Sequence, residues 1–423
     1  MTVGLSFVGL LLVGLPISLT LAVLALIYIV VSGNTVLLQS YPQQMFGGLE
    51  SYGMLALPLF ILLGEFMNAG GIGRRLMAFA LALLGPMRGG LAYVNLGANM
   101  MMASILGSTV AQITIMSRLA VPEMERAGYA RDVATTITAA GGLLAPIIPP
   151  SMMFIIFGVI AQVPIGDMFI AGIVPGILIF VAFCGLIGWQ ARRHDFPRTP
   201  SMSMRERVRA VVDALPAALI PASIIASILG GFATATEAAT VASLLAILIG
   251  MFVYREMTVA DIWPALVNAA RGAAVVLFLI AAAQVFSWVI TYENLPAIVA
   301  SYMSGLTDSP VVFLLLLNLL LLCLGMITDP IPAIILIVPV FLPVATDVYG
   351  IDPIHFGVVL CLNLTLGLLT PPVGTGLFTA SLLTGVRAER IAFLLMPFLA
   401  VAFLVIGLIV LWPQIALGLV RGL

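Results

Sequence analysis

Apolar runs long enough to cross a lipid bilayer recur along the whole chain and constrain its fold more than any other feature. A transmembrane helix needs roughly 20 mostly apolar residues. The chain of 423 residues is 62% hydrophobic and 8% charged, whereas soluble domains carry about 25% charged residues. No stretch between the apolar runs is long enough for a separate soluble domain. We therefore predict one all-helical membrane domain over residues 1–423.

Several other classes of protein are disfavoured by the same sequence. A net charge of −1 without a basic patch offers nucleic acid no binding surface. The three cysteines stand singly in apolar runs and the two histidines lack nearby ligand residues, so we expect packing roles and no structural metal. The sequence contains no Ser-His pair, no paired catalytic aspartates and no HExxH motif, which disfavours an enzyme. Residues 3–31 lack the basic start of a signal peptide, so we expect a retained spanning helix.

Arginine placement indicates which connections face the cytoplasm, because cytoplasmic loops of membrane proteins are rich in basic residues. All 17 basic residues are arginines, and all except Arg421 fall in clusters that alternate with arginine-free connections. We expect the arginine-free connections on the periplasmic side of a bacterial inner membrane. They are residues 32–51, 232–234, 292–309 and 347–353.

The alternation predicts nine crossings, with the N-terminus in the cytoplasm and the C-terminus in the periplasm. Two further apolar stretches, residues 89–120 and 310–346, have both ends on one side of the membrane. We interpret each as a re-entrant helical hairpin, although two more full crossings per stretch would also suit the flanking residues. The predicted crossings are residues 3–31, 52–69, 131–163, 167–190, 210–231, 235–254, 268–291, 351–385 and 389–420.

A short motif recurs at equivalent points in the two halves of the chain. Residues 142–150 read GLLAPIIPP, and residues 367–375, which begin 225 positions later, read GLLTPPVGT. Each motif lies in a crossing that follows a predicted hairpin, and the two crossings run in opposite directions. Glycine and proline are common in membrane helices, so a chance match is the alternative. The matched placement favours an inverted-topology repeat, which underlies many secondary transporters.

The prolines in these motifs are expected to break their helices, because proline lacks a backbone donor and clashes with the preceding turn. The affected positions are residues 146–150 and 371–372. Unwound backbone is tolerated inside a membrane only where it lines a cavity or lies buried in protein. Free carbonyls in such a break suit a sodium ion, and the adjoining helix N-termini suit a carboxylate.

The predicted hairpin tips carry complementary polar groups. The first tip lies in ASILGSTVAQ and the second in LGMITDPIPA. Asp329 precedes a proline and so can cap the following helix, but an ionisable residue inside a membrane is also usually functional. Glu65 and Glu237 lie in or near apolar runs, with a structural hydrogen bond as the alternative role. No arginine lies near either tip, so cations and helix dipoles would have to neutralise an anionic substrate.

Five stretches of the chain carry a family resemblance. They are GGLAYVNLGANMMMASILGSTVAQ, VPEMERAGY, GLLAPIIPPSMMFIIFG, GGFATATEAATVAS and, above all, LGMITDPIPAIILIVPVFLPVATDVYGIDPIHFGVVLCLNLTLGLLTPPVGTGLF. They resemble the large membrane subunit (M subunit, DctM-like) of tripartite ATP-independent periplasmic (TRAP) transporters. The resemblance implies sodium-coupled uptake of organic acid anions by an elevator mechanism. The scaffold would comprise residues 1–86 and 205–300, and the transport part residues 87–190 and 305–423.

The resemblance also implies partners and site residues. The partners are a small four-helix membrane subunit (Q type) and a periplasmic substrate-binding protein (P type). The first tip departs from the family pattern, because it reads LGST rather than SGSS and has Gln112 in place of an aspartate. The sodium ligands would be Ser104, Ser108, Gly142 and Pro146 in the first half and Thr328, Asp329, Gly367, Thr370 and Val373 in the second. The substrate would contact Gly107, Thr109, Pro150, Pro330 and Pro372.

Alternatives within transport remain open at this point. A single-component divalent-anion symporter would share the hairpins and broken helices without needing a partner, but the TEAA loop and the DPIPAIILIVP run favour the TRAP family. A passive channel would not need inverted repeats with re-entrant tips. Four-carbon dicarboxylates, keto acids, sugar acids and sialic acid are all compatible substrates, because the binding protein makes much of the selection.

Overall fold

The computed structural model describes residues 6–7, 9–10, 12–33, 36–85, 87–193, 196–197 and 203–422, without the side chains of Tyr52 and residues 104–106. The regular elements in these ranges are helices, which confirms the predicted all-helical fold. Seven of them are long and apolar enough to cross a membrane. They are α10 (Ile165–Arg193), α11 (Met204–Leu229), α12 (Ala235–Leu248, extended by a π-helical turn), α13 (Val259–Tyr292), α15 (Pro310–Ile327), α16 (Pro330–Pro343, extended likewise) and α19 (Ala388–Leu411).

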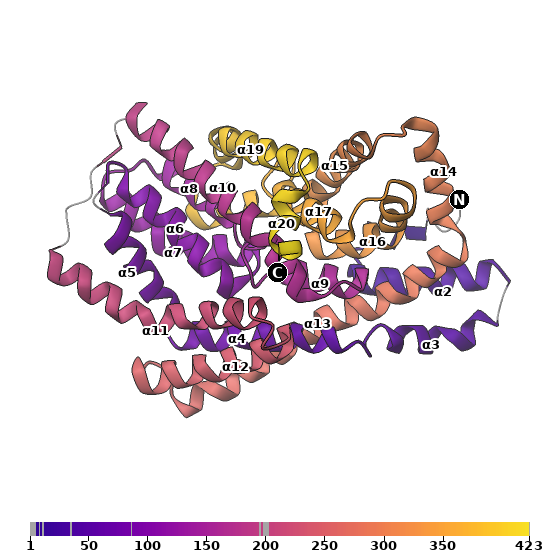
Figure 1. The fold of residues 1–423 in the computed structure, drawn as a ribbon, viewed down its shortest axis with the longest axis horizontal. Coiled ribbons are helices and arrows are strands. Elements are labelled where there is room, and N and C mark those ends of the chain that lie inside the picture. The colour runs from indigo at the N-terminus through magenta and orange to yellow at the C-terminus, as the bar shows by residue number, and fades with distance from the viewer. Residues whose placement is uncertain are drawn as a thin grey trace.

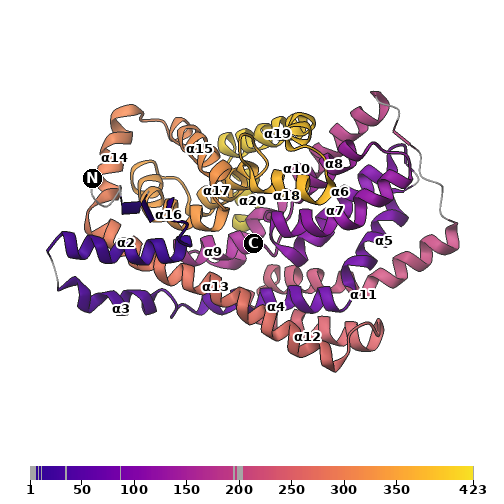
Figure 2. The ribbon, with the colours of Figure 1, turned by 180° about the vertical axis from the view of Figure 1, so that it is seen from behind.

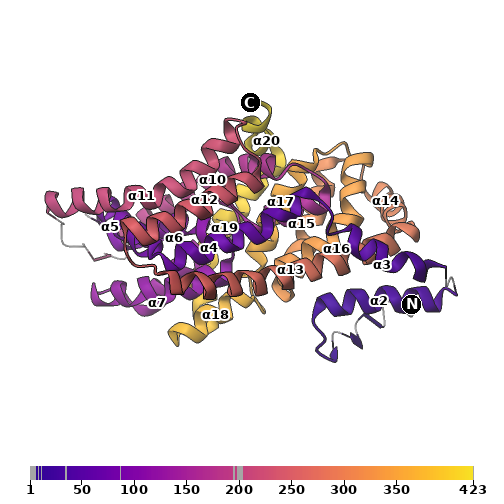
Figure 3. The ribbon, with the colours of Figure 1, turned by 90° about the horizontal axis from the view of Figure 1, so that it is seen from below.

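The helices form two layers. Long oblique helices run along one side of the molecule, namely α2 (Ile17–Val31), α3 (Leu37–Gly47), α4 (Ala56–Ala69), α11, α12 and α13 (Figure 1). Within this layer α13 packs against α2, α3 and α4, and the views from behind and below show the same grouping (Figures 2 and 3). The other layer contains the hairpins and broken helices. The division into scaffold and transport parts, and their relative motion, stay predictions.

Each predicted hairpin is a pair of helices joined at a short tip. The first pair is α6 (Gly90–Leu106) and α7 (Thr109–Arg126), and the second is α15 and α16. The second tip lies level with the middle of the next broken helix, because the Gly374 backbone N–H donates to the Met326 carbonyl at 3.0 Å. This contact favours the re-entrant interpretation, even though α15 and α16 each meet the length and hydropathy expected of a full crossing.

Both proline motifs interrupt a helix, as predicted. In the second break the carbonyls of residues 369–372 accept no hydrogen bond from the described part of the chain. Each break contains one cis peptide bond, Pro149–Pro150 in the first and Pro371–Pro372 in the second. The first broken helix comprises α8 (Arg131–Gly142) and α9 (Met152–Ala161), and the second comprises α17 (Pro353–Gly367) and α18 (Thr375–Thr384).

The two halves repeat one packing pattern. In each half the first hairpin arm packs against the first part of its own broken helix, with α6 on α8 and α15 on α17. The second arm crosses to the other half, so that α7 packs on α18 and α16 packs on α9. Such a reciprocal exchange is expected of an inverted repeat. It joins both hairpins and both broken helices into one packed unit.

A sharp bend follows α4 and fixes its end. The bend between α4 and α5 (Ile72–Leu84) measures 70°, and Gly71 takes a positive φ of 66° there. The Arg75 guanidinium lies 2.8 Å from a Glu256 carboxylate oxygen and 3.7 Å from the Tyr254 ring centre. This hydrogen-bonded arginine lowers the pKa of the Glu256 carboxyl below its ordinary value. The ion pair ties the bend to the connection between α12 and α13.

The structure differs from the prediction at several helix boundaries. The predicted crossing of residues 3–31 is interrupted over residues 13–16, where the chain turns at Gly14 with a φ of 81°. The predicted crossing of residues 389–420 ends at Leu411, because Pro413 stops α19, and α20 (Gln414–Gly422) follows as a separate helix. Three further helices lie in stretches that the prediction treated as connections: α3, α5 and α14 (Leu295–Leu306).

Arg421, the arginine outside the cytoplasmic set, has a local structural role. Its guanidinium lies 3.0 Å from the Asp352 carboxylate, which caps α17 by accepting from the Ile354 backbone N–H at 2.9 Å. Nearby, His355 Nε2 lies 2.9 Å from the Ile409 carbonyl, whose usual helical donor is missing because residue 413 is proline. These contacts fasten the last two helices to the start of the second broken helix.

Gly367 permits the close approach of the second hairpin to its broken helix. A Cβ at Gly367 would lie 2.6 Å from backbone atoms of Gly325. We expect Gly367→Ala to cost roughly 1–3 kcal/mol by overpacking and to lower the thermal midpoint of the purified protein. Gly407→Ala in α19, where a Cβ meets nothing within 4 Å, should leave the midpoint unchanged or raise it. Equal midpoints for the two variants would contradict this packing.

Candidate functional site

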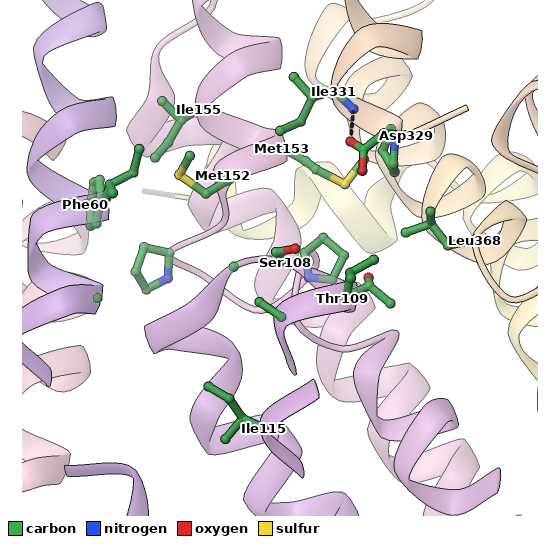
Figure 4. Close-up of a pocket in the computed structure, with 18 of the residues that line it drawn as sticks. Phe60, Ser108, Thr109, Ile115, Met152, Met153, Ile155, Asp329, Ile331 and Leu368 are labelled. Carbon is green, nitrogen blue, oxygen red and sulfur yellow. Dashed lines mark hydrogen bonds between the residues drawn. The ribbon is translucent and has the colours of Figure 1, made fainter. Parts of the chain in front are cut away.

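A cavity of about 360 Å³ lies where both hairpin tips, both breaks and α4 meet (Figure 4). Ser108 and Thr109 come from the first tip, Asp329 from the second, and Phe60 from α4, and these side chains surround a common space in the close-up. Residues remote in sequence therefore share one compartment. The predicted site residues that line it are Gly107, Ser108, Thr109, Pro146, Pro150, Asp329 and Pro330.

The other predicted residues whose side chains the structure describes do not line this cavity. Gly142 instead faces α7, where an added Cβ would lie 2.6 Å from Ile113. Pro372 and Val373 are exposed in the second break. The Ser104 side chain lies outside the described part of the structure. The others outside the cavity are Thr328, Gly367 and Thr370, which belong to the second tip and its break.

The first hairpin is held together by a chain of buried amides. Gln112 Nε2 on α7 donates to Asn99 Oδ1 on α6 at 3.1 Å, and Asn99 Nδ2 donates to Asn95 Oδ1 at 2.8 Å. Asn95 Nδ2 then donates to Thr138 Oγ1 on α8 at 2.7 Å. The glutamine that departs from the family pattern therefore links the two hairpin arms, and the network ties both arms to the first broken helix.

Two buried oxygens near the first tip lack hydrogen-bond donors. Thr109 Oγ1 and Gln112 Oε1 are enclosed, and neither has a partner among the described residues. Buried polar atoms are nearly always paired with protein or an ordered solvent group. The two oxygens therefore have the chemistry to accept a cation or a water molecule at this tip.

A matching amide contact holds the second hairpin. Asn363 Nδ2 on α17 donates to Asn318 Oδ1 on α15 at 2.5 Å, and Asn318 Nδ2 donates to the Leu314 carbonyl at 2.7 Å. Asn363 lies 225 positions after Thr138, the same offset as the repeated motif. Each half therefore fastens its first hairpin arm to its broken helix at an equivalent place. The sequence analysis missed these contacts, although asparagines inside apolar runs were a signal for them.

The second tip shows that Asp329 has the predicted capping role. Its Oδ1 accepts a hydrogen bond from the Ile331 backbone N–H at 3.1 Å, drawn dashed in Figure 4. The same carboxylate lines the cavity, so capping leaves it accessible there. Thr328 Oγ1 donates to the Leu324 carbonyl at 3.0 Å, and Thr370 Oγ1 donates to the Leu366 carbonyl at 2.7 Å. Each threonine oxygen keeps lone pairs for a further partner.

Ser151 organises the first break, and the sequence analysis did not identify it. Its hydroxyl donates to the Pro146 carbonyl at 2.5 Å and accepts from the Phe154 N–H at 3.4 Å. The Pro146 carbonyl needs this donor because residue 150, its usual helical partner, is a proline. The position was readable as an N-cap, since a serine directly precedes the apolar run of α9.

Comparison with known proteins shows the family of this chain. The sequence profile of the DctM component of tripartite ATP-independent periplasmic transporters matches residues 5–415. The chain belongs to this family. It is 35% identical over 412 residues to the sialic acid TRAP transporter large permease SiaM of Vibrio cholerae, covering 97% of this chain and 96% of that protein. It is 37% identical over 336 residues to the 2,3-diketo-L-gulonate TRAP transporter large permease YiaN of Escherichia coli, covering 79% of each.

A solved structure shares the fold of this TRAP permease. The YdaH transporter of Alcanivorax borkumensis, whose structure is described as having an unusual topology, superposes with a TM-score of 0.67 at 15% identity. The match covers 92% of this chain and 90% of that one. The family prediction is confirmed, and the protein is a multi-pass membrane transporter rather than an enzyme.

The TRAP permease cavity is acidic on two walls. Glu65 on α4 and Asp329 at the second tip are its charged residues, and no arginine or histidine is among the described residues that line it. Asn268 Nδ2 on α13 lies 3.5 Å from Glu65 Oε2, at the limit of a hydrogen bond. Glu237, by contrast, forms a capping box with Thr234 at the start of α12, which fits the structural alternative for that residue. An anion in this cavity would lie near two carboxylates and no basic side chain of the described lining.

Proposed function

We propose that this chain is the large membrane subunit of a sodium-coupled TRAP transporter that takes up organic acid anions across the bacterial inner membrane. One observation carries the proposal: the described residues that line the cavity shared by both tips and both breaks include two carboxylates and no basic residue. Binding an organic anion there requires bound cations, and sodium suits hard oxygen ligands. Relatives named for sialic acid and for C4-dicarboxylates support the organic acid class.

The proposed sodium sites lie between each tip and the break of its own half. In the second half, Thr328, Asp329 and Thr370 offer side-chain oxygens. The unwound turn from Gly367 to Val373 offers the free carbonyls of residues 369–372. In the first half, Ser104, Ser108 and the break at Gly142 and Pro146 are the proposed ligands. The donor-free oxygens of Thr109 and Gln112 support a cation near that tip.

An elevator movement follows from the two-layer architecture. The hairpins and broken helices form one interlocked unit, whereas α4 meets that unit across the cavity. In this conformation the cavity lies beside the half of α4 that leads to Arg74 and Arg75. Because the arginine pattern assigns that end to the cytoplasm, we propose that the structure represents an inward-facing state.

A small membrane subunit and a periplasmic binding protein complete the proposed transporter. Two relatives are longer than this chain, which supports a second membrane subunit or domain in the complete transporter. The chain covers 62% of the isethionate TRAP transporter permease DctMQ of Oleidesulfovibrio alaskensis and 65% of the sialic acid TRAP transporter permease SiaT of Haemophilus influenzae. The alternative is a symporter that works without partners.

Reconstitution separates these two alternatives. Proteoliposomes containing this chain, the small subunit and external binding protein should show saturable, sodium-dependent uptake of an organic acid. Omitting either partner should reduce uptake to the background of empty liposomes, because the binding protein delivers substrate and the small subunit supports the scaffold. Full uptake by the chain alone would establish the single-component symporter instead.

Substitution at the second break tests the sodium site directly. A lost hydrogen-bonding ligand is worth about 1–1.5 kcal/mol, so Thr370→Ala should raise the sodium concentration for half-maximal uptake by roughly fivefold to tenfold. Thr379→Ala is the matched control, because that hydroxyl also bonds a backbone carbonyl, at 2.8 Å, but lies on α18 beyond the break. The control should keep the wild-type sodium dependence.

Asp329→Asn distinguishes the two roles of Asp329 in the same assay. Asparagine caps helices nearly as well as aspartate, so a purely capping residue would tolerate the change. A charge that holds sodium would not, and we expect a strong increase in the sodium requirement. Unchanged sodium dependence in both Thr370→Ala and Asp329→Asn, at normal expression, would place the second sodium site elsewhere.

A further inference from the structure

The scaffold wall of the cavity carries a carboxylate with little local pairing. Glu65 is the one ionisable residue in α4. Its Oε2 receives the long 3.5 Å contact from Asn268, and within the described residues its other oxygen accepts no hydrogen bond. The side chain is half-buried and lines the cavity opposite the hairpin tips. A merely structural carboxylate would be expected to have closer partners.

The position of Glu65 along α4 is asymmetric. Residues 51–64, which precede it and include the cavity-lining Phe60, Ile61 and Gly64, contain no charged side chain. Glu65 lies in the half of α4 next to the bend that leads to Arg74 and Arg75. A transport unit sliding along α4 would therefore pass from the part of this helix without charged residues to the part that carries Glu65 as it approached the arginine-rich side.

We propose that Glu65 is an electrostatic release residue: it repels the bound organic anion only when the site stands at the cytoplasmic end of α4. This inference rests on the proposed function. It assigns to Glu65 the control of substrate affinity in the inward-facing state. Two like charges in a partly desolvated cavity repel at distances of several ångströms, and the repulsion weakens as the site moves away. The substrate would therefore bind less tightly where it must leave.

The other charged groups near this wall do not cancel the effect. Arg271 lies three residues beyond Asn268 on α13, but it does not line the cavity and forms no ion pair with Glu65 in the described part of the chain. Asp329 belongs to the second hairpin and moves with the site, so its charge acts in every state. Of the two charged residues that line the cavity, Glu65 is the one whose distance from the substrate would change during transport.

The test measures affinity separately on the two sides of the membrane. Proteoliposomes containing this chain with its small subunit, and external binding protein, would be assayed with labelled succinate, gluconate or N-acetylneuraminate, whichever the wild type transports. One measurement is the external concentration for half-maximal uptake. The other is the internal concentration of the same unlabelled acid that halves uptake by occupying the cytoplasm-facing site.

Glu65→Gln should lower the internal half-inhibitory concentration by about tenfold while changing the external value less than twofold. Glu123→Gln is the charge-matched control, because it removes a carboxylate from the exposed end of α7 outside the cavity. It should change neither value. No change with Glu65→Gln, or equal changes on both sides, would overturn the release role and leave Glu65 as a structural partner of Asn268. Absence of wild-type uptake for every acid would instead contradict the proposed function itself.

Discussion

Backbone groups freed by proline inside a membrane must find partners, and the centre of this molecule is organised around that requirement. Water is absent from the hydrocarbon core, so each unpaired carbonyl there costs several kcal/mol. The two breaks expose such carbonyls, and the hairpin tips pack directly beside them. Ser151 satisfies the Pro146 carbonyl in the first break, and the tip and break of the second half share a backbone hydrogen bond. Carbonyls that remain free have the chemistry of the ligands that the proposed sodium ions would need.

The same requirement explains why the hairpins and broken helices behave as one body. Asparagine amides fasten the first arm of each hairpin to its broken helix, through Asn95 and Thr138 in one half and Asn318 and Asn363 in the other. Amide pairs in an apolar interior are costly to separate, because each partner would be left without a donor or acceptor. The second arms cross between halves and lock the two units together. The proposed elevator movement would carry this unit along the surface that faces α4.

Much of this arrangement was predictable from the sequence, because proline and glycine act locally. Each GLL motif carries two consecutive prolines, which remove two adjacent backbone donors and so predict a break in the helix, and Asp329 before a proline indicates a cap. The paired asparagines were not predicted, since Asn318 and Asn363 are far apart in the sequence and neither residue identifies the other. Glu65 was recognised as unusual, but its place in the cavity depends on how α4 lies against the tips. Helices α5 and α14 were missed because both fall in stretches that the arginine pattern assigned to connections.

The central claim is that an organic anion and sodium occupy the cavity between the tips, the breaks and α4. The most direct measurement is alkylation of a single cysteine at Ser108, in a variant lacking the native cysteines and assembled with its partners. Sodium together with the transported acid should slow the reaction of Ser108→Cys more than either alone. A cysteine at Leu382, which is 85% exposed on α18 outside the cavity, should react at the same rate throughout. Equal reactivity of Ser108→Cys with and without both ligands, under conditions that support uptake, would show that the substrate binds elsewhere.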